Sequence, residues 1–314
     1  MLYTTIVKTS QPRTLALSAG ALLICLASAA GPCTASSIVT TLGSAGPGNW
    51  AILLGPNTTD LALNGPGTTI GNVGYDGTHM AQLNASDGHQ AINGNLFLTA
   101  GASVNDATQV SGTIVSPFAI LGADWTTALN ASAVFAAMAA NFSVPGGKVN
   151  GTMTINSQCA GCTNVIDLSS LKLGNGQVLT LNGGASDQFI INISDEFTLN
   201  SGRILLTGGL TAADVVFNVT SSGNAVSASG GLNNESIVTG ILLAPNSGIA
   251  FAPGLINGEL IAGGSTVHLV SGASTTEAVV ISAVPELSTY LLLGSGLLVL
   301  GCRGLKSKAT ASRR

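Results

Sequence analysis

Few side chains in this sequence are of the kinds that carry out catalysis. The chain has 3 His, which are His79, His89 and His268. No pair of histidines stands at the His-Glu-x-x-His spacing of a zinc site, and the sequence contains no Gly-x-Ser-x-Gly turn of a serine hydrolase. We therefore predict that the protein is not an enzyme, with no catalytic residue, no metal and no cofactor.

Two of the histidines belong to short polar segments that resemble each other. Asp76-Gly77-Thr78-His79 and Asp87-Gly88-His89 both place a carboxylate just before an imidazole. Such a pair can bind a metal or a sugar, but Asp-Gly is also a common turn sequence. We favour two polar turns and keep a binding site as the alternative.

The cysteines point to a local crosslink. Of the 5 Cys, Cys25 and Cys33 lie in the N-terminal segment and Cys302 lies near the C-terminus, which leaves Cys159 and Cys162 alone in the central part. A redox-active Cys-x-x-Cys usually begins a helix, whereas this one follows a strand-like stretch. Two cysteines do not complete a four-ligand zinc site. We predict a disulfide between Cys159 and Cys162 and keep redox activity as the alternative.

Charge divides the chain into three parts. Residues 1–35 carry two bases and no acid (+2), residues 36–283 carry three bases and thirteen acids (-10), and residues 284–314 carry five bases and one acid (+4). The central part offers only Lys148, Lys172 and Arg203 to neutralise phosphates. Because tight nucleic-acid binding needs several such contacts, we exclude DNA and RNA as partners.

The N-terminal part has the layout of a secretory signal. Lys8 and Arg13 precede an apolar stretch over residues 15–30, which is followed by small residues. Cleavage can follow Ala29 or, as we prefer, fall between Ala35 and Ser36. The expected partners are the Sec translocon and signal peptidase, and the exported body then begins near residue 36.

The C-terminal part combines a short motif, an apolar run and a basic tail. The motif consists of Val284, Pro285, Glu286, Leu287, Ser288 and Thr289. The basic tail contains Arg303, Lys306, Lys308, Arg313 and Arg314. Residues 287–302 between them would span about 24 Å as a helix, close to the thickness of a bilayer core. We predict a short transmembrane helix in the inner membrane with its positive end inside.

This arrangement resembles the PEP-CTERM sorting signal of Gram-negative bacteria. The usual second proline of that motif is Leu287 here. The resemblance implies recognition by an exosortase-type membrane protease, transient anchoring through residues 287–302, and release to the cell surface. A permanent tail anchor is the alternative.

The central part, residues 36–283, has the pattern of many short strands. β-Branched and aliphatic stretches alternate with Gly and Asn turns. Expected strands cover residues 49–54, 92–98, 149–155, 189–193, 203–206, 215–219, 237–243, 259–261 and 267–270. The spacing fits a sandwich or a β-solenoid, and the corner-forming Gly and Asn favour the solenoid.

One segment instead has a helical pattern. Asp124 can cap a helix over about residues 124–142, with Trp125, Leu129, Phe135 and Phe142 on one face, together with Met138. We expect this amphipathic helix to cover an open flank of the solenoid. Membrane binding is a poor alternative because its polar face carries no Lys or Arg.

With these elements placed, four segments resemble the choice-of-anchor A family of bacterial surface proteins: residues 49–55, 92–96, 240–246 and 256–263. The body is also distantly similar to the bacterial ice-binding adhesin fold. The resemblance implies a β-solenoid with one helix along its side and a location at the cell surface. It implies no reaction.

The leading hypothesis is an exported, non-enzymatic surface or matrix protein, an adhesin or structural component associated with exopolysaccharide. An ice-binding or polysaccharide-binding module is the alternative; ice binding favours ranked threonines, yet residues 152–154 form the one Thr-x-Thr of the body. An envelope glycan hydrolase is a third hypothesis, which requires two facing carboxylates.

Overall fold

The computed structural model describes residues 37–231 and 234–278. Within them the chain is mainly β, as predicted, and the strands pair in parallel in a 16-stranded and an 8-stranded sheet. The signal with its cleavage site at Ala35 and Ser36, and everything from residue 279 on, lie outside the described residues. Among the residues that are described, no helix is long and apolar enough to cross a membrane.

The smaller sheet forms one side of the body. Its strands, in spatial order, are β11 (Met153–Asn156), β13 (Val178–Asn182), β15 (Arg203–Thr207), β18 (Ser236–Thr239), β21 (Gly254–Asn257), β24 (Ser274–Thr276), β3 (Thr69–Ile70) and β6 (Ile92–Asn93).

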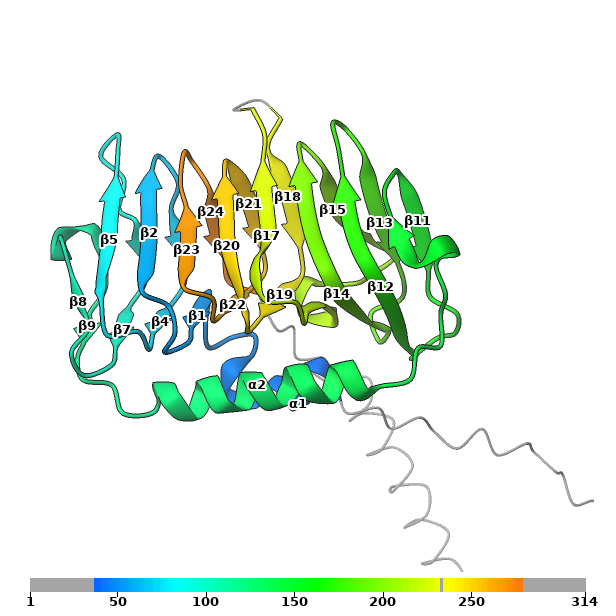
Figure 1. Cartoon of the computed structure of the whole chain (residues 1–314), viewed down its shortest axis with the longest axis horizontal. Coiled ribbons are helices and arrows are strands. Elements are labelled where there is room, and N and C mark those ends of the chain that lie inside the picture. The colour runs from blue at the N-terminus through cyan, green and yellow to red at the C-terminus, as the bar shows by residue number, and fades with distance from the viewer. Residues whose placement is uncertain (1–36, 232–233, 279–314) are drawn as a thin grey trace, which may run out of the picture. The chain divides into compact units, whose positions relative to one another are not determined.

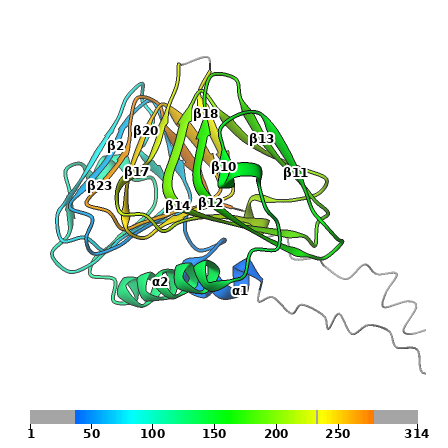
Figure 2. The same ribbon diagram turned by 45° about the vertical axis from the view of Figure 1, so that its right-hand side comes forward.

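The larger sheet bends into two strips. The helix-side strip contains β9 (Ile114–Val115), β7 (Leu96–Leu98), β4 (Val73–Tyr75), β1 (Ile52–Leu54), β22 (Leu260–Ala262), β19 (Ile241–Ala244), β16 (Val215–Val219) and the first halves of β14 (Gln188–Asn200) and β12 (Thr163–Leu173). The open strip contains β8 (Ser103–Val104), β5 (Met80–Ala85), β2 (Asp60–Gly65), β23 (Thr266–Leu269), β20 (Ser247–Ala252), β17 (Gly223–Ser229), the second halves of β14 and β12, and β10 (Lys148–Val149). Figure 2 shows the three sides meeting at corners.

The chain passes repeatedly from the smaller sheet to the helix-side strip and then to the open strip, and we call each such passage a coil. The coils do not stack in sequence order. The last strands of the body pair with the first ones, β22 with β1, β23 with β2 and β24 with β3. Figure 1 accordingly shows the blue N-terminal strands beside the orange C-terminal ones.

Alternation of side chains builds the interior. In each strand every second residue points inward, and the largest fully buried side chains include Tyr75, Phe189, Phe197, Phe217 and Phe251. Phe197 and Phe217 meet edge to face with ring centroids 5.7 Å apart. Stacked coils bury a continuous core in this way, which no coil could bury alone.

Asparagine side chains join neighbouring coils at the corners. Asn95 donates to Asn72 Oδ1 over 3.1 Å. On other strands, Asn105 donates to Asn84, and Asn84 donates to Asn64.

The corners also explain why some expected strands are split. Residues 92–98 form β6 and β7 because the chain turns at Gly94, where a Cβ would lie 2.1 Å from the carbonyl oxygen of Gly71.

Residues 149–155 and 237–243 are likewise divided between two strands each, β10 and β11 in the first case and β18 and β19 in the second. Propensity marks these stretches as extended but does not show where a corner interrupts them.

A helical layer covers the helix-side strip. It contains α1 (Ile38–Leu42) and α2 (Leu121–Ala137), with a 3-10 turn at Gly43–Ala45 between α1 and β1. Three further 3-10 turns lie at Ala107–Gln109, Pro145–Gly147 and Ala212–Asp214. Apolar residues on the outside of the strip, such as Val216 and Ile241, pack against Trp125 and Phe135 of α2.

The boundaries predicted for the long helix are wrong at both ends. It begins at Leu121 after Ile120, so Asp124 is a buried residue of the first turn and not the cap. It ends at Ala137 because Met138 is extended. Phe142 lies outside the helix and bridges to Ile166 of β12. Asn141 holds that segment, since its side chain donates to Thr163 O and accepts from Val165 N.

Candidate binding surface

The smaller sheet carries an uncharged column of outward side chains, which we call the threonine column. It contains Thr154, Thr180, Leu205, Thr239, Asn257, Thr276, Ile70 and Asn93. The register of the paired strands places these residues next to one another, and Leu205 and Thr239 each lie two residues beyond the paired residues Arg203 and Ile237. Neighbouring side chains in a parallel sheet stand about 4.8 Å apart. The column therefore offers hydroxyl, amide and methyl groups at a regular repeat.

A second outward column runs beside the first and is mostly apolar. Register places Val178, Arg203, Ile237, Leu255 and Ser274 next to one another across five strands. Within the two columns, Arg203 is the one charged side chain. Leu205 is 38% exposed and Ile70 is 48% exposed, although both are large and apolar. The surface combines exposed aliphatic groups with threonine hydroxyls, so it can contact a ligand without first displacing tightly bound ions.

The open strip has a different surface, which carries ion pairs. Lys172 pairs with Glu196, and this contact together with the Thr198 hydroxyl lowers the pKa of Glu196. His268 Nε2 lies 2.8 Å from Asp60 Oδ2 on the neighbouring strand. Exposed pairs of this kind add little stability. They do make the open strip more polar than the smaller sheet.

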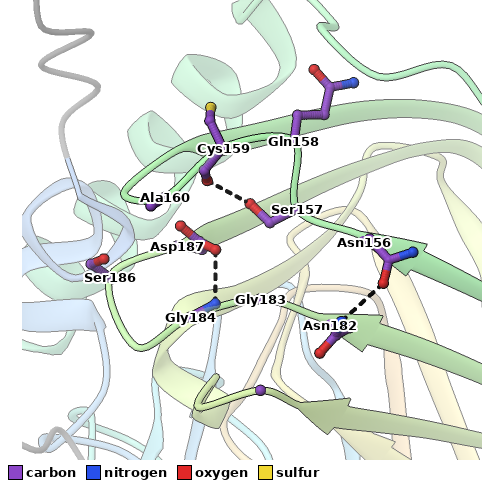
Figure 3. A pocket seen from close by; sticks show the side chains of 11 residues that line it. Asn156, Ser157, Gln158, Cys159, Ala160, Asn182, Gly183, Gly184, Ser186 and Asp187 are labelled. Atoms are coloured by element: carbon purple, nitrogen blue, oxygen red, sulfur yellow. Dashed lines mark hydrogen bonds between the residues drawn. The ribbon is translucent and has the colours of Figure 1, made fainter.

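An open hollow of about 410 Å³ lies where the chain turns from β11 and β13 of the smaller sheet toward the helix-side strip (Figure 3). The bond between Cys159 and Cys162 closes the loop at its rim, with Cα atoms 5.5 Å apart. Asp187 lies at its base and accepts from the backbone N–H groups of Gly161, Cys162 and Gly184. These hydrogen bonds lower the pKa of Asp187 against the opposing effect of burial.

Much of the polar lining of this hollow is already paired. Asn182 donates to Asn156 Oδ1 over 2.9 Å, and Ser157 donates to the carbonyl oxygen of Cys159 over 3.0 Å. The carboxylate of Asp187 thus fixes the loop that the disulfide closes. The arrangement indicates a stabilised corner and not a catalytic site.

The two Asp-Gly-His turns do not meet. Asp76 and His79 precede β5, whereas Asp87 and His89 follow it, and its six residues separate the turns by about 20 Å. Burial raises the pKa of Asp76, against the effect of its hydrogen bond with Thr99. Among the described residues no group of three or more His, Cys, Asp or Glu side chains could hold a metal.

One carboxyl group is fully buried. Glu259 follows β21 at the corner below the smaller sheet, and neither of its carboxyl oxygens has a hydrogen-bond partner among the described residues. Burial, together with the nearby charge of Glu277, raises the pKa of Glu259 well above its usual value. Burial of this carboxyl group favours its neutral form, because it penalises the charged form.

Sequence reasoning missed the threonine column. Its members come from strands that are neighbours in space but lie 18 to 34 residues apart within the run from Thr154 to Thr276. A search for Thr-x-Thr looks along a strand, whereas this column runs across strands. The sequence did offer one signal of the coil length. Polar residues that lie side by side on neighbouring strands recur after 26 and then 25 positions, namely Asn156, Asn182 and Thr207.

Comparison with known proteins supports the same architecture. The model of an ice-binding-like adhesive domain matches residues 30–273. The crystal structure of an ice-binding protein from the Antarctic ascomycete Antarctomyces psychrotrophicus is similar with a TM-score of 0.50 and 22% identity, covering 76% of this chain and 98% of that chain.

A glycosylated ice-binding protein from an Arctic yeast is similar with a TM-score of 0.51 and 18% identity, covering 77% of this chain and 96% of that chain. At these identities the likenesses show the fold alone. None of the curated proteins compared with the chain matches it.

Proposed function

Because the chain belongs to the family of ice-binding-like adhesive domains, we propose that it is an exported, non-enzymatic binding protein that uses the smaller sheet to bind ice. The observation that carries this proposal is the threonine column. Thr180, Thr239 and Thr276 stand in one outward row with aliphatic and amide neighbours, on a sheet whose outer side the helical layer leaves uncovered. The coiled arrangement of parallel strands supports the β-solenoid that the sequence predicted.

A row of this kind suits an ordered, uncharged ligand. Ice presents hydroxyl groups at a fixed repeat, and a rigid sheet meets them without losing side-chain freedom, because threonine has a restricted χ1. The exposed Leu205 and Ile70 add apolar contact area. The open strip fits such a surface less well, since it carries the Lys172–Glu196 pair.

The test is thermal hysteresis and inhibition of ice recrystallisation by residues 36–283. We expect both activities in the unaltered body and a loss of several-fold on replacing Thr180 or Thr239 by Tyr, which places a bulky ring in the row. Ser227→Tyr in β17 of the open strip is the matched control and should keep both activities. If Ser227→Tyr abolishes both activities and the variants at Thr180 and Thr239 retain them, the smaller sheet is not the ice-binding surface. An inactive unaltered body rejects ice binding.

Adhesion to exopolysaccharide is the second candidate, favoured by the adhesive description of the family. An inactive body in the ice assays that is retained by an exopolysaccharide affinity matrix would support it.

Delivery to the surface is part of the proposal. Residues 1–35 would direct export, and the motif over residues 284–289 would be recognised by an exosortase-type protease after residues 287–302 insert in the inner membrane. Intact-mass measurement of protein from the cell surface tests this. Loss of the chain beyond this motif supports processing, whereas retention of Arg313 and Arg314 indicates a permanent anchor.

A further inference from the structure

The helical layer presents an uncharged outer surface. Residues 37–51 and 118–147, which form this layer and its flanking loops, include one charged residue, Asp124, and it is only 4% exposed. Soluble surface helices normally carry charged residues on the side that faces water. The solvent side of α2 has none among these described residues.

Large apolar side chains are exposed on the same surface. Ile120 is 53% exposed, Leu129 is 38% exposed and Val134 is 45% exposed. The other exposed residues of α2 are mostly small ones such as Ala133 and Ala137, together with the uncharged Thr126 and Asn130. The opposite side of the helix already packs on the helix-side strip, so this outer face is the one that remains without a partner in the described body.

The described chain ends beside this layer. Glu277 donates from its backbone N–H to Ile70 O and stands at the corner between the smaller sheet and the helix-side strip. At that corner Gly71 is so close that a Cβ on it would lie 2.9 Å from Glu277 Cβ. The chain therefore leaves the body at an edge that only two surfaces share, the smaller sheet and the helical layer.

The segment that follows is short. Eight residues, 279–286, separate Ala278 from the start of the apolar run at residue 287. Fully extended, they reach at most about 28 Å. When residues 287–302 are inserted in a bilayer, the corner at Ala278 must lie within that distance of the membrane. The two surfaces that adjoin this corner are then the ones nearest to the lipid.

The two surfaces differ in what they would lose on contact with lipid. The smaller sheet would bring Arg203 and the amides of Asn93 and Asn257 toward the bilayer, and each polar group would lose water. The outer face of α2 would bring alanines together with Ile120, Leu129 and Val134. Its exposed polar side chains are Asn130 and Thr126, the hydroxyl of Thr126 already donates to Gly122 O, and no charged side chain accompanies them. The helical layer is the surface that favours this contact.

We infer that the outer face of α2 is a membrane-contact surface, which lies against a bilayer of lipids without net charge while the chain is anchored. The inference rests on the proposed C-terminal anchor. That anchor would hold the body at the bilayer and so take the place of the electrostatic attraction by Lys and Arg, whose absence argued against membrane binding by this helix alone. In this orientation the smaller sheet and the open strip slope away from the membrane, so the threonine column stays available to a ligand outside.

The experiment uses residues 36–314 reconstituted in phosphatidylcholine vesicles, since a face without Lys or Arg needs no anionic lipid. Cys302→Ser leaves the disulfide-bonded pair as the remaining cysteines. A single new cysteine then carries an environment-sensitive fluorophore, either Ala133→Cys on α2 or Ala250→Cys on β20 of the open strip, both exposed alanines. Quenching by nitroxide-labelled phosphatidylcholine reports contact with lipid, and vesicle flotation reports anchoring.

We expect the label at residue 133 to be quenched at least three-fold more than the label at residue 250, and Val134→Asp to reduce that quenching without preventing flotation. Flotation with equal quenching at both positions overturns the inference while the anchor stands. A label at residue 133 that is shielded from aqueous iodide but not reached by nitroxide lipid indicates a second copy on this face, which also overturns it. Failure to float rejects the anchor and the inference with it.

Discussion

A buried polar cluster fixes α2 on the sheet, and its removal should loosen the whole helical layer. Ser132 donates its hydroxyl to Asn218 Oδ1 over 2.6 Å. Asn218 in turn donates to Ser132 O over 3.0 Å and to Asn192 Oδ1 over 2.9 Å. Asn192 donates to Phe135 O, so two successive coils hold one helix. Asn218 is fully buried, and Ser132 and Asn192 are buried as well, so water cannot replace the hydrogen bonds among them.

The perturbation is Asn218→Leu, which keeps the number and branching of the side-chain heavy atoms and removes the hydrogen bonds. It leaves the Oδ1 of Asn192 without its donor and the hydroxyl of Ser132 without its acceptor, at about 1–3 kcal/mol for each buried group. Some of this is offset by the added apolar contact, so the free energy of unfolding should fall by about 2–5 kcal/mol. Ser132→Ala leaves Asn218 Oδ1 without its donor and should lower the free energy of unfolding by about 1–3 kcal/mol.

The double variant separates this cluster from ordinary packing. Because Ser132 has no acceptor left in the Asn218→Leu background, the two losses should overlap, and the double variant should lose about 1–2 kcal/mol less than their sum. Urea unfolding of residues 36–283 measures this through the fluorescence of Trp50 and Trp125, which both lie in the cluster between the helices and the sheet. Ser227→Ala on the open strip is the control. Additive losses, or a loss below 1 kcal/mol for Asn218→Leu, would refute the reasoning.

Three further outcomes concern the carboxyl group of Glu259, the disulfide and the packing of α2. The pKa of Glu259 is raised in the folded state, so its contribution to the free energy of unfolding is complete below the ordinary pKa of a glutamate. This contribution declines by about 1.4 kcal/mol per pH unit as the pH rises toward the raised pKa. Glu259→Gln should remove that decline in urea unfolding at pH 5, 6 and 7, and an equal pH dependence in both proteins would contradict the prediction. Replacing Cys159 and Cys162 together by Ser opens a ring with a sequence separation of 3 and should cost about 2 kcal/mol, a melting temperature lower by a few degrees, whereas an unchanged value on adding reductant argues against the bond. Gly263→Ala would place a Cβ 2.4 Å from the Trp125 ring and 2.3 Å from Pro245 O, so calorimetry should show a loss of at least about 2 kcal/mol, and a neutral result would mean that α2 packs elsewhere.

Much of the architecture was predictable because it depends on local chemistry. β-Branched stretches between Gly and Asn turns indicate short strands, and the strand at Val215–Val219 has the predicted bounds. A run of Ala around Trp125 and Phe135 indicates a helix. The helix boundaries failed because they are decided by pairing: Asn141 hydrogen-bonds β12 and draws residues 138–142 out of the helical conformation.

The binding surface could not be predicted, for a geometric reason. Residues that form a column across parallel strands are separated in the chain by a whole coil, and coil length varies with each corner. Thr276 and Ile70 are paired although 206 positions separate them, since the N-terminal coils stack on the C-terminal ones. No pattern within a local window contains that information.

The sequence by itself determined the charge distribution, the export and anchoring signals as expectations, the mainly β composition and the scarcity of catalytic side chains, because each is a property of residue types and short spacings. The tertiary structure alone decided the order of the coils, the row of Thr180, Thr239 and Thr276, the burial of Glu259 and the exposed face of α2. These depend on strand register and on which surface each side chain meets, and both arise from contacts between residues that are distant in the chain.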